Sequence, residues 1–448
     1  MALSGVEIFK LLPKTNCKKC GFPTCLAFAM KLAQRQASLD ACPDVSEEAK
    51  RILGEASAPP IKAIAIGNGE KAVKLGEETV LFRHEKKFVN PCAFALSIKD
   101  TLSSEELKNK VKAVLDSEIE RVGQRLRADM ILADNESGDS GKFESAVKQI
   151  IQDAPNIPLI LKSQSPSNIE TAIKYCSDKR PLIYTATNDN YEVMAKIARD
   201  NNAVLCVYAE GTEALSSLAE KVKSAGMDDI ILDSGARKAK DMLEHYTQIR
   251  RAAIKKSFKP LGYPVISFAE REDPMHEIAL ASIGVTKYAS IIVLSSIEKW
   301  KMLALLTQRQ NIYTDPQVPM QVEQKIYKVG EPTQKSPLLI TTNFSLTYFI
   351  VQGEVENSKV PSWLAVMDVE GLSVLTAWAA GKFTASKISE FIKESGVEKN
   401  IAHKELIIPG YVAILSGALE DKLEGWKITV GPREANALPS FLKARTTN

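Results

Sequence analysis

The chain has 448 residues, of which 45% are hydrophobic and 25% charged, and its formal net charge is +3. This is the composition of an ordinary globular protein long enough for about three domains. The near-neutral charge argues against a dedicated nucleic-acid binder, and no apolar run approaches the roughly 18 residues of a membrane span. The N-terminal residues lack a secretory signal pattern, so we expect a cytoplasmic protein.

The seven cysteines are unevenly distributed along the chain. Four of them lie within the first 42 residues, and three are scattered. The clustered ones are Cys17, Cys20, Cys25 and Cys42, and the scattered ones are Cys92, Cys176 and Cys206. A disulfide scaffold is short and evenly rich in cysteine, so this pattern indicates a reducing compartment and one local cysteine site.

The N-terminal part of the sequence predicts short helices, then a linker, then a small β element. The segment up to about Leu53 predicts short helices. Residues Gly54–Pro60 read as a linker, because Pro-Pro cannot continue a helix. The segments Ile61–Ile66, Ala72–Leu75 and Thr79–Arg83 predict a small antiparallel β element.

From about residue 88 to residue 313, short apolar runs alternate with longer amphipathic segments. Continuous apolar runs are typical of buried parallel strands. Eight of them over about 225 residues predict a (β/α)8 TIM-type barrel, with a doubly wound sheet as the alternative. The predicted strands are Val89–Ala95, Asp129–Ala133, Pro158–Leu161, Pro181–Tyr184, Ala203–Val207, Asp229–Leu232, Pro264–Phe268 and Ser290–Leu294. The first predicted helix is Ser104–Arg127.

Prolines between Pro316 and Pro337 mark a second boundary, after which strand and helix patterns alternate again. This order predicts a small, open, parallel Rossmann-like sheet. The predicted strands are Leu338–Thr342, Trp363–Asp368, Glu405–Ile408 and Trp426–Val430. The predicted domains are therefore 1–57 (cysteine-rich), 58–325 (barrel with the N-terminal β element) and 326–448 (α/β).

The clustered cysteines have the spacing C-x2-C-x4-C-x16-C-P. Zinc and iron–sulfur centres both use four thiolates. Zinc sites usually come as two short pairs, whereas here three cysteines are crowded and Cys42 stands alone. Gly21 and Pro23 favour tight turns. Pro43 follows Cys42 directly, as a proline follows the remote cysteine ligand in ferredoxins. The pattern favours a 4Fe-4S cluster; zinc and four buried reduced thiols remain the alternatives.

Small and hydroxyl residues follow three strands of the predicted C-terminal sheet, in the stretches Thr341–Thr347, Asp368–Thr376 and Gly431–Ala435. Ligands of open parallel sheets bind beyond the carboxyl ends of the strands, near free N–H groups of helix starts. Glycines there let backbone approach a large planar ring closely. The same residues are also routine caps, so a cofactor site and ordinary capping both remain open.

The run Thr15–Ala29, TNCKKCGFPTCLAFA, resembles the cluster domain of the large (gamma) subunits of corrinoid iron–sulfur proteins. That family belongs to the reductive acetyl-CoA (Wood–Ljungdahl) pathway of acetogenic and methanogenic anaerobes. The order of a cluster domain, a barrel and a C-terminal corrinoid domain also fits, so the resemblance extends over the whole chain.

The resemblance implies a 4Fe-4S cluster on Cys17, Cys20, Cys25 and Cys42. It also implies a C-terminal domain that binds a corrinoid (cobamide), with no catalytic residue assigned. The candidate corrinoid-binding residues are Thr341, Thr347, Gly371, Leu372, Ser373, Val374, Gly431 and Ala435.

The implied function is a methyl carrier, a methyltransferase component of the transferase class. Cob(I)amide would accept a methyl group from methyltetrahydrofolate held by a separate methyltransferase and donate it to acetyl-CoA synthase. The cluster would re-reduce cob(II). The implied partners are a small subunit in a heterodimer, that methyltransferase, acetyl-CoA synthase and a low-potential electron donor, with no nucleic acid and no membrane.

Many corrinoid proteins supply a histidine to cobalt from an Asp-x-His-x-x-Gly motif. The chain has only His84, His245, His276 and His403, and none of them lies in that motif. We therefore expect no protein histidine on the cobalt. A cobalt without a strong lower ligand is easier to reduce to cob(I).

Two other functions stay open. A self-sufficient, pterin-dependent corrinoid methyltransferase would bind its methyl donor at polar stretches that follow barrel strands, such as Asp134–Asp139 and Thr185–Asn190. An iron–sulfur/flavin electron-transfer protein would bind a flavin or nucleotide in the α/β domain. No G-x-G-x-x-G motif follows a predicted strand, which counts against that last function.

Overall fold

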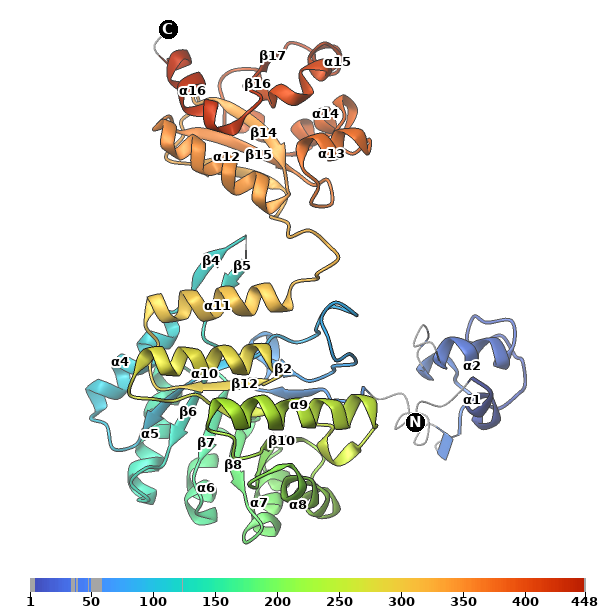
Figure 1. Cartoon of the computed structure of the whole chain (residues 1–448), viewed down its shortest axis with the longest axis vertical. Coiled ribbons are helices and arrows are strands. Elements are labelled where there is room, and N and C mark those ends of the chain that lie inside the picture. The colour runs from blue at the N-terminus through green and yellow to red at the C-terminus, as the bar shows by residue number, and fades with distance from the viewer. Residues whose placement is uncertain are drawn as a thin grey trace. The chain divides into compact units, whose positions relative to one another are not determined.

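The computed structural model describes residues 5–33, 37, 39–46, 48–49, 59–122 and 124–446. The chain divides into two compact units, residues 1–119 with 126–313, and residues 120–125 with 314–448 (Figure 1). The predicted linker Gly54–Pro60 lies outside the described residues, except for its last two. In the part of the chain that the structure describes, no helix has the length and apolar content needed to cross a membrane.

The described residues of the cysteine-rich region include the short α-helices α1 (Gly5–Leu11) and α2 (Cys25–Ala33), which confirms the predicted short helices. A 3-10 turn, η1 (Leu39–Ala41), follows before Cys42. Ile8 of α1 and Phe28 and Ala29 of α2 are buried together in a small hydrophobic cluster. This cluster also contains Cys25 and Cys42, so the cysteine site and the core of the region are one structure.

Eight parallel strands form the predicted TIM-like barrel, in the order β10-β9-β8-β7-β6-β3-β12-β11. A parallel bridge between Leu232 and Val265 joins the two ends of this order, so the barrel is nearly closed. Within it, Leu96 of β3 lies between Ile131 of β6 and Leu294 of β12. The strands are β3 (Ala93–Lys99), β6 (Met130–Asp134), β7 (Leu159–Lys162), β8 (Leu182–Ala186), β9 (Val204–Tyr208), β10 (Ile230–Asp233), β11 (Ile266–Phe268) and β12 (Ile291–Leu294).

An α-helix follows each barrel strand and covers its outer side (Figure 1). The first begins with a capping box, in which Ser103 Oγ accepts from the Glu106 N–H and the Glu106 carboxylate accepts from the Ser103 N–H. The helices are α4 (Ser104–Leu115), α5 (Ser140–Asp153), α6 (Pro166–Ile173), α7 (Tyr191–Asp200), α8 (Thr212–Ser224), α9 (Ala239–Lys255), α10 (Pro274–Thr286) and α11 (Lys299–Tyr313).

The predicted helix Ser104–Arg127 is wrong in its second half. Helix α4 ends at Leu115, and the chain then forms a hairpin, β4 (Ile119–Arg121) with β5 (Gln124–Leu126). The Ser117 hydroxyl donates to the Val114 carbonyl and accepts from the Ala128 N–H, which closes the helix. Val122 at the hairpin tip packs in a core of the second unit, a tertiary contact that local propensity does not contain.

The N-terminal β element has two strands, β1 (Ile64–Ile66) and β2 (Val73–Leu75), paired antiparallel as predicted. The predicted third strand, Thr79–Arg83, is wrong. The Val80 carbonyl accepts two hydrogen bonds from the buried Arg250 guanidinium, at 3.1 and 2.6 Å, and Arg250 also pairs with Glu78. The backbone group that a strand ladder would use is therefore taken by a side chain.

The second unit has a five-stranded sheet in the order β13-β15-β14-β16-β17. Four of its strands are parallel, as predicted: β14 (Leu338–Thr342), β15 (Ser362–Met367), β16 (Glu405–Ile408) and β17 (Lys427–Val430). The expectation of a purely parallel sheet is wrong, because β13 (Lys325–Val329) pairs antiparallel with β15. The predicted domain boundary at 325/326 falls inside this edge strand, while the compact units divide after Tyr313.

Helices cover both faces of this sheet. Leu338 and Ile340 of β14 pack with Phe391 of α14, whereas Leu339 packs with Val355 of α12, as the alternation of side chains along a strand requires. The helices are α12 (Ser345–Ser358), α13 (Val374–Ala379), α14 (Ala385–Glu394), α15 (Ser416–Lys422) and α16 (Leu438–Thr446). The chain runs from β14 to β15 on one side and returns to β16 on the other, so a topological switch point lies at β14.

Candidate cofactor sites

The four clustered cysteines differ in exposure. Cys25 and Cys42 are buried, Cys20 is partly buried and Cys17 is exposed, and all four are free thiols. Cys20 packs against the same hydrophobic cluster that contains Cys25 and Cys42. The Sγ atom of Cys17 lies 3.6 Å from Oδ2 of Asp44, two residues after Cys42. The cysteines thus lie in one small region.

The loop between α1 and α2 is shaped by residues in the left-handed region. Asn16, Lys18 and Gly21 have φ of 48°, 62° and 82°. The Gly21 N–H donates to the Lys18 carbonyl at 2.9 Å, which closes a turn that contains Cys20. The Asn16 side chain accepts from the Cys25 N–H at 2.8 Å. The loop therefore folds back onto the first residue of α2, as the predicted tight turns require.

An ion pair between Lys19 and Asp44 lies beside the cysteines of this loop. Lys19 Nζ lies 3.1 Å from Asp44 Oδ2, and this hydrogen bond raises the pKa of Lys19 above its ordinary value. Cys17 and Cys42 lie close enough to Lys19 to contribute to the same shift. A lysine near two candidate thiolate ligands is suited to offset part of the negative charge that a four-thiolate centre carries.

The donor set fits a four-thiolate centre in its chemistry. No group of three or more His, Cys, Asp or Glu side chains is gathered to ligating distance among the described residues, so the thiols share a region without a ligand geometry. Cys25 is the first residue of α2, so one of the four thiols lies at a helix start. Four free thiols around such a start are suited to an iron–sulfur or zinc centre.

The three scattered cysteines lie elsewhere, in buried positions of the barrel unit. Burial raises the pKa of Cys92 and of Cys176 to about 12, and raises the pKa of Cys206 well above its ordinary value. A thiol ligates or reacts as its thiolate, so these three side chains are suited to packing rather than to metal binding.

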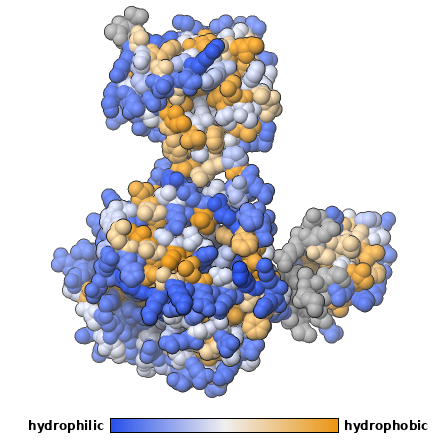
Figure 2. All heavy atoms as spheres, viewed as in Figure 1, coloured by the Kyte–Doolittle hydropathy of each residue, from blue (hydrophilic) through white to orange (hydrophobic). Residues whose placement is uncertain are grey.

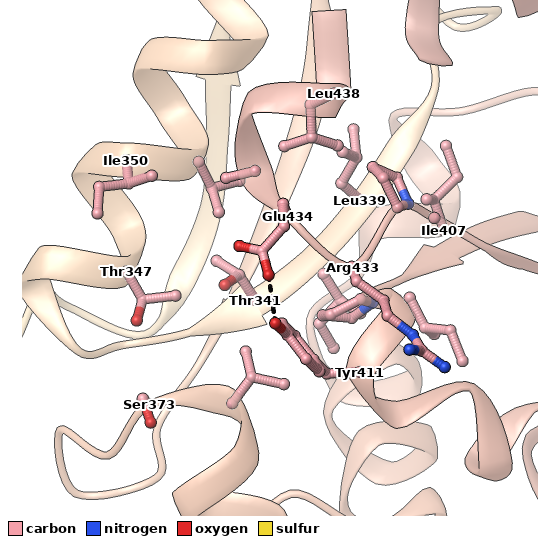
Figure 3. A pocket seen from close by; sticks show the side chains of 18 of the residues that line it. Leu339, Thr341, Thr347, Ile350, Ser373, Ile407, Tyr411, Arg433, Glu434 and Leu438 are labelled. Carbon is pink, nitrogen blue, oxygen red and sulfur yellow. Dashed lines mark hydrogen bonds between the residues drawn. The ribbon is translucent and has the colours of Figure 1, made fainter. Parts of the chain in front are cut away.

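A cavity of about 280 Å³ opens at the carboxyl ends of β14, β16 and β17, at the switch point (Figure 3). Its walls come from β14 and β16, from α12, from the loop that follows β17 and from the loop that leads into α13. Six of the eight candidate corrinoid-binding residues line it, and the remaining two, Gly371 and Leu372, do not. The six are Thr341, Thr347, Ser373, Val374, Gly431 and Ala435.

Among the described residues, the Thr341 hydroxyl is a buried polar group of the cavity lining without a hydrogen-bond partner. Thr341 is 1% exposed, it lines the cavity, and its Oγ1 has no hydrogen-bond partner. Buried hydroxyls in proteins are nearly always paired, so an unpaired one facing a cavity is suited to a ligand. Thr342 also has an unpaired buried hydroxyl but does not line the cavity, and nothing in the structure explains it.

The strand end after β16 contributes Tyr411, which the sequence analysis missed, and Tyr411 contacts Glu434 of the predicted stretch Gly431–Ala435. Tyr411 and Glu434 both line the cavity, and the Tyr411 hydroxyl donates to the Glu434 carboxylate (Figure 3). This hydrogen bond raises the pKa of Tyr411. The rule that selected the other three strand ends applies equally to Pro409–Tyr411 and would have found this one.

Exposed apolar side chains surround the cavity. Figure 2 shows apolar residues gathered on the visible face of the C-terminal unit. Ile350, Leu375 and Tyr411 line the cavity and are also 48%, 43% and 43% exposed. Neighbouring residues on α12 and α13 are exposed in the same way: Leu346, Phe349 and Trp378. An apolar patch around a cavity is typical of a binding surface.

The two candidate glycines serve protein packing. A Cβ on Gly371 would lie 2.8 Å from Cγ of Gln321, and one on Gly431 would lie 3.1 Å from the Ile408 carbonyl oxygen. The expected use of both glycines was the close approach of a planar ring. The structure fills the space over both with other parts of the chain, although the backbone of Gly431 still lines the cavity.

The polar stretches at the barrel strand ends are occupied by mutual hydrogen bonds. Asn135 donates to Asp100 and to the Asp139 carbonyl, and its Oδ1 accepts from Ser163 and Asn168. The full hydrogen-bonding capacity of this amide is therefore used within the protein. In the second stretch, Asn188 accepts from Lys221 Nζ.

The residues that line the cavity, all within the described part of the chain, include no histidine. His403 is half-buried rather than fully exposed before β16, where its Nε2 lies 2.9 Å from the Ser336 carbonyl oxygen. Its Nδ1 accepts from the Glu405 N–H. Both ring nitrogens of His403 are therefore engaged by backbone.

A four-cysteine region, a nearly closed parallel barrel and an α/β unit with a strand-end cavity define a multidomain α/β protein with two candidate cofactor sites. The family model described as "CO dehydrogenase/acetyl-CoA synthase delta subunit" matches residues 63–442, and the one described as "Putative Fe-S cluster" matches residues 12–43. The chain belongs to the family of corrinoid/iron–sulfur protein large subunits and acetyl-CoA decarbonylase/synthase gamma subunits.

The relatives match over nearly their whole length. The chain is 46% identical to the "Corrinoid/iron-sulfur protein large subunit" of Moorella thermoacetica, over 99% of each chain. It is 36% identical to the "Acetyl-CoA decarbonylase/synthase complex subunit gamma" of Methanopyrus kandleri, over 98% of this chain and 97% of that one. A dihydropteroate synthase structure from Burkholderia cenocepacia aligns at 13% identity and a TM-score of 0.35, covering 52% and 96% of the two chains, which carries no functional conclusion.

Proposed function

We propose that this chain is a methyl carrier of the acetyl-CoA pathway that binds a corrinoid in its C-terminal cavity and a 4Fe-4S cluster on its N-terminal cysteines. The observation that carries this proposal is the switch-point cavity. Six residues chosen from the sequence line it, and one of them, Thr341, presents an unpaired buried hydroxyl. The name of the Moorella relative, matched over the whole chain, supports the same pair of cofactors.

Different residues of the cavity would make the polar and the apolar contacts with a bound corrinoid. The Thr341 hydroxyl supplies a hydrogen-bonding group from the cavity floor, and Thr347 and Ser373 supply two more at its sides. Ile350 and Leu375 supply apolar surface that excludes water from the ring. When bound, the corrinoid supplies a cobalt that takes up and passes on a methyl group, and the cluster supplies low-potential electrons.

Cys17, Cys20, Cys25 and Cys42 would hold the cluster, and Lys19 would offset its charge. Their differing exposure suits an electron-transfer site, because the exposed Cys17 side leaves the centre reachable. The 4Fe-4S form, and the absence of a histidine from the cobalt, remain parts of this proposal.

The exposed apolar residues around the cavity support the proposal that a partner protein covers this surface. The archaeal relatives are named as subunits of an acetyl-CoA decarbonylase/synthase complex. We propose the small subunit of a heterodimer, a methyltetrahydrofolate–corrinoid methyltransferase and acetyl-CoA synthase as the proteins that meet this chain. Each would need access to the cavity, where the lining residues Ile350, Leu375 and Tyr411 are partly exposed.

The self-sufficient methyltransferase is the second candidate, and hydrogen bonding at the barrel strand ends disfavours it. Asn135, one of its candidate donor-binding residues, has all its hydrogen-bonding capacity filled by neighbouring side chains and backbone. A pterin would have to break that network to be recognised there. The flavin alternative has no observation in its favour.

A methyl-transfer assay separates the first two functions. The full chain, co-purified with its small subunit and loaded with corrinoid, is reduced and given methyltetrahydrofolate, with and without an added methyltransferase. The carrier account expects corrinoid methylation only with the added enzyme, and an Asn188→Ala variant indistinguishable from wild type. Methylation without added enzyme that Asn188→Ala abolishes would replace the carrier by the self-sufficient enzyme.

A further inference from the structure

One buried amide, that of Asn343, organises the loop that follows β15. Asn343 comes directly after β14 and is 2% exposed. Its Oδ1 accepts from two backbone N–H groups, those of Val369 and Gly371, each at 3.0 Å. Its Nδ2 donates to Asp368 Oδ1 at 2.8 Å. All three partners belong to the loop 368–371, so one side chain fixes both ends of that loop.

The same amide reaches a second segment, which we call the strap, residues 319–324. Asn343 Nδ2 also donates to Gln321 Oε1 at 3.2 Å. The strap runs along the backbone around Asn343, because the Val322 N–H donates to the Asn343 carbonyl at 2.9 Å. Gln324 of the strap accepts from the Asp368 N–H at 2.8 Å. The strap therefore touches the loop both directly and through Asn343.

The loop has a backbone conformation that needs such support. Glu370 and Gly371 have φ of 59° and 72°, two successive residues in the left-handed region. A Cβ on Gly371 would lie 2.8 Å from Cγ of Gln321 and 3.1 Å from the Pro319 carbonyl oxygen. A left-handed non-glycine residue is strained and persists only where surrounding contacts hold it. Here those contacts come from Asn343 and from the strap.

The loop leads straight into the wall of the cavity. Ser373 and Val374 line the cavity, and they lie two and three residues after Gly371. Asn343 itself does not line the cavity. It can act on a bound ligand only through the loop that it holds.

We propose that Asn343 is the positioning residue of the cavity: it fixes the loop 368–371, and so sets Ser373 and Val374 against the bound corrinoid, with Gln321 of the strap as its second anchor. This inference rests on the proposed function. It adds that the positions of Ser373 and Val374 depend on the amide of Asn343, which does not line the cavity. It also adds that the strap, residues 319–324, shares in that control through Gln321.

The first test measures the loop without a ligand. Amide hydrogen exchange is followed in the full-length apo chain for wild type, Asn343→Ala and Thr342→Val. Thr342 is the matched control, because it is the adjacent buried residue and its hydroxyl has no partner. We expect Asn343→Ala to speed exchange at Val369 and Gly371 by about tenfold or more, while Thr342→Val leaves both unchanged. Equal exchange in Asn343→Ala and wild type would overturn the proposal.

The second test uses Gln321, whose replacement leaves the buried amide in place. The glutamine side chain accepts from Asn343 through Oε1, so Gln321→Glu keeps the acceptor and Gln321→Ala removes it. We measure hydroxocobalamin binding and the visible absorption of the bound corrinoid. Gln321→Ala should weaken binding by about threefold to tenfold and shift the spectrum, with rescue in Gln321→Glu. If both variants bind as wild type does, the strap has no role.

The two proposals fail in different ways. Wild type that takes up no hydroxocobalamin would remove the proposed function itself, whereas the exchange result for Val369 and Gly371 would still stand. Wild type that binds it normally, together with an Asn343→Ala variant that binds equally well, would remove only the positioning role.

Discussion

The backbone N–H of Cys25 donates a 2.8 Å hydrogen bond to Oδ1 of Asn16. This contact ties the loop that carries Cys17 and Cys20 to the first residue of α2. Asn16 also has a φ of 48°, a conformation that asparagine tolerates better than most residues. One side chain thus supports both the backbone and the closure of the cysteine loop.

Replacing Asn16 should loosen the cysteine site in a graded way. Asn16→Asp keeps the acceptor, Asn16→Gly keeps only the backbone freedom, and Asn16→Ala keeps neither. We expect iron release to a chelator to accelerate in that order, by up to about thirtyfold for Asn16→Ala, because a lost cap and a left-handed alanine each cost about 1 kcal/mol. Equal release rates in all four proteins would show that this contact does not support the site.

The cysteines should separate into two groups by substitution. Serine at Cys17, Cys20, Cys25 or Cys42 should reduce the iron content of the anaerobically purified chain to less than about half. Cys92→Ser is the matched control, because burial raises the pKa of that thiol to about 12 and leaves it a packing group. Iron analysis of each variant decides this, and loss of iron in the Cys92 variant alone would contradict the assignment.

The unpaired hydroxyl of Thr341 should matter only to a ligand. Thr341→Val removes a buried polar atom that has no partner, so the apoprotein should be unchanged or slightly more stable. Corrinoid affinity should fall by about fivefold to tenfold, the equivalent of one hydrogen bond of about 1 kcal/mol. Titration with hydroxocobalamin measures this, with Thr342→Val as the control that should bind normally. Unchanged affinity in Thr341→Val would remove Thr341 from the site.

Glu405 should make the stability of the second unit depend on acid. Burial opposes its ionisation, but hydrogen bonds from Thr429 and Arg445 outweigh burial and hold the pKa of Glu405 below its ordinary value of 4.5. The unfolded chain then binds a proton more readily, so this contribution is present above about pH 4.5 and is lost as the pH falls through the folded pKa.

Urea denaturation at pH 7 and at about pH 3.5 tests this dependence. The drop in unfolding free energy between the two pH values should be smaller in Glu405→Gln than in wild type. The exposed Glu420→Gln is the control and should retain the wild-type drop. An unchanged drop in Glu405→Gln would assign the acid sensitivity to other groups.

Lys301 and Glu277 form an ion pair in which both side chains are fully buried. The Ser295 N–H also donates to Glu277, so the pair anchors the loop after β12. Lys301→Met should destabilise the barrel unit by about 3–5 kcal/mol, because it leaves a buried carboxylate without its cation. Adding Glu277→Gln should recover a large part of this loss. Chemical denaturation measures both, with the exposed Lys299→Met expected to stay near wild type.

The sequence predicted the parallel strands well, because continuous apolar runs report burial on both sides. All eight barrel strands and four strands of the second sheet lie at or within a few residues of their predicted positions. The failures came where another part of the chain decides the local structure. Arg250 takes the carbonyl of Val80, and the second unit buries Val122, so neither a third strand after β2 nor a continued α4 forms.

The sequence identified some residues of the candidate sites and not others. The cysteine positions follow from spacing alone, and strand-end rules led to six of the cavity residues. The role of Asn343 was not predictable, because its four partners become neighbours only when β14, β15 and the strap pack together. Gly371 was predicted to let a planar ring approach the backbone. The structure places Gln321, which lies 50 residues earlier in the chain, over this glycine.

The most direct test of the whole account is a metal and optical analysis of the anaerobically purified chain, co-expressed with its small subunit in a corrinoid-making host. Iron, cobalt and zinc are quantified while the visible spectrum is followed during low-potential reduction. We expect about four iron atoms and one cobalt per chain, with a cob(I) band on reduction. Zinc without iron, and no uptake of added corrinoid, would contradict it.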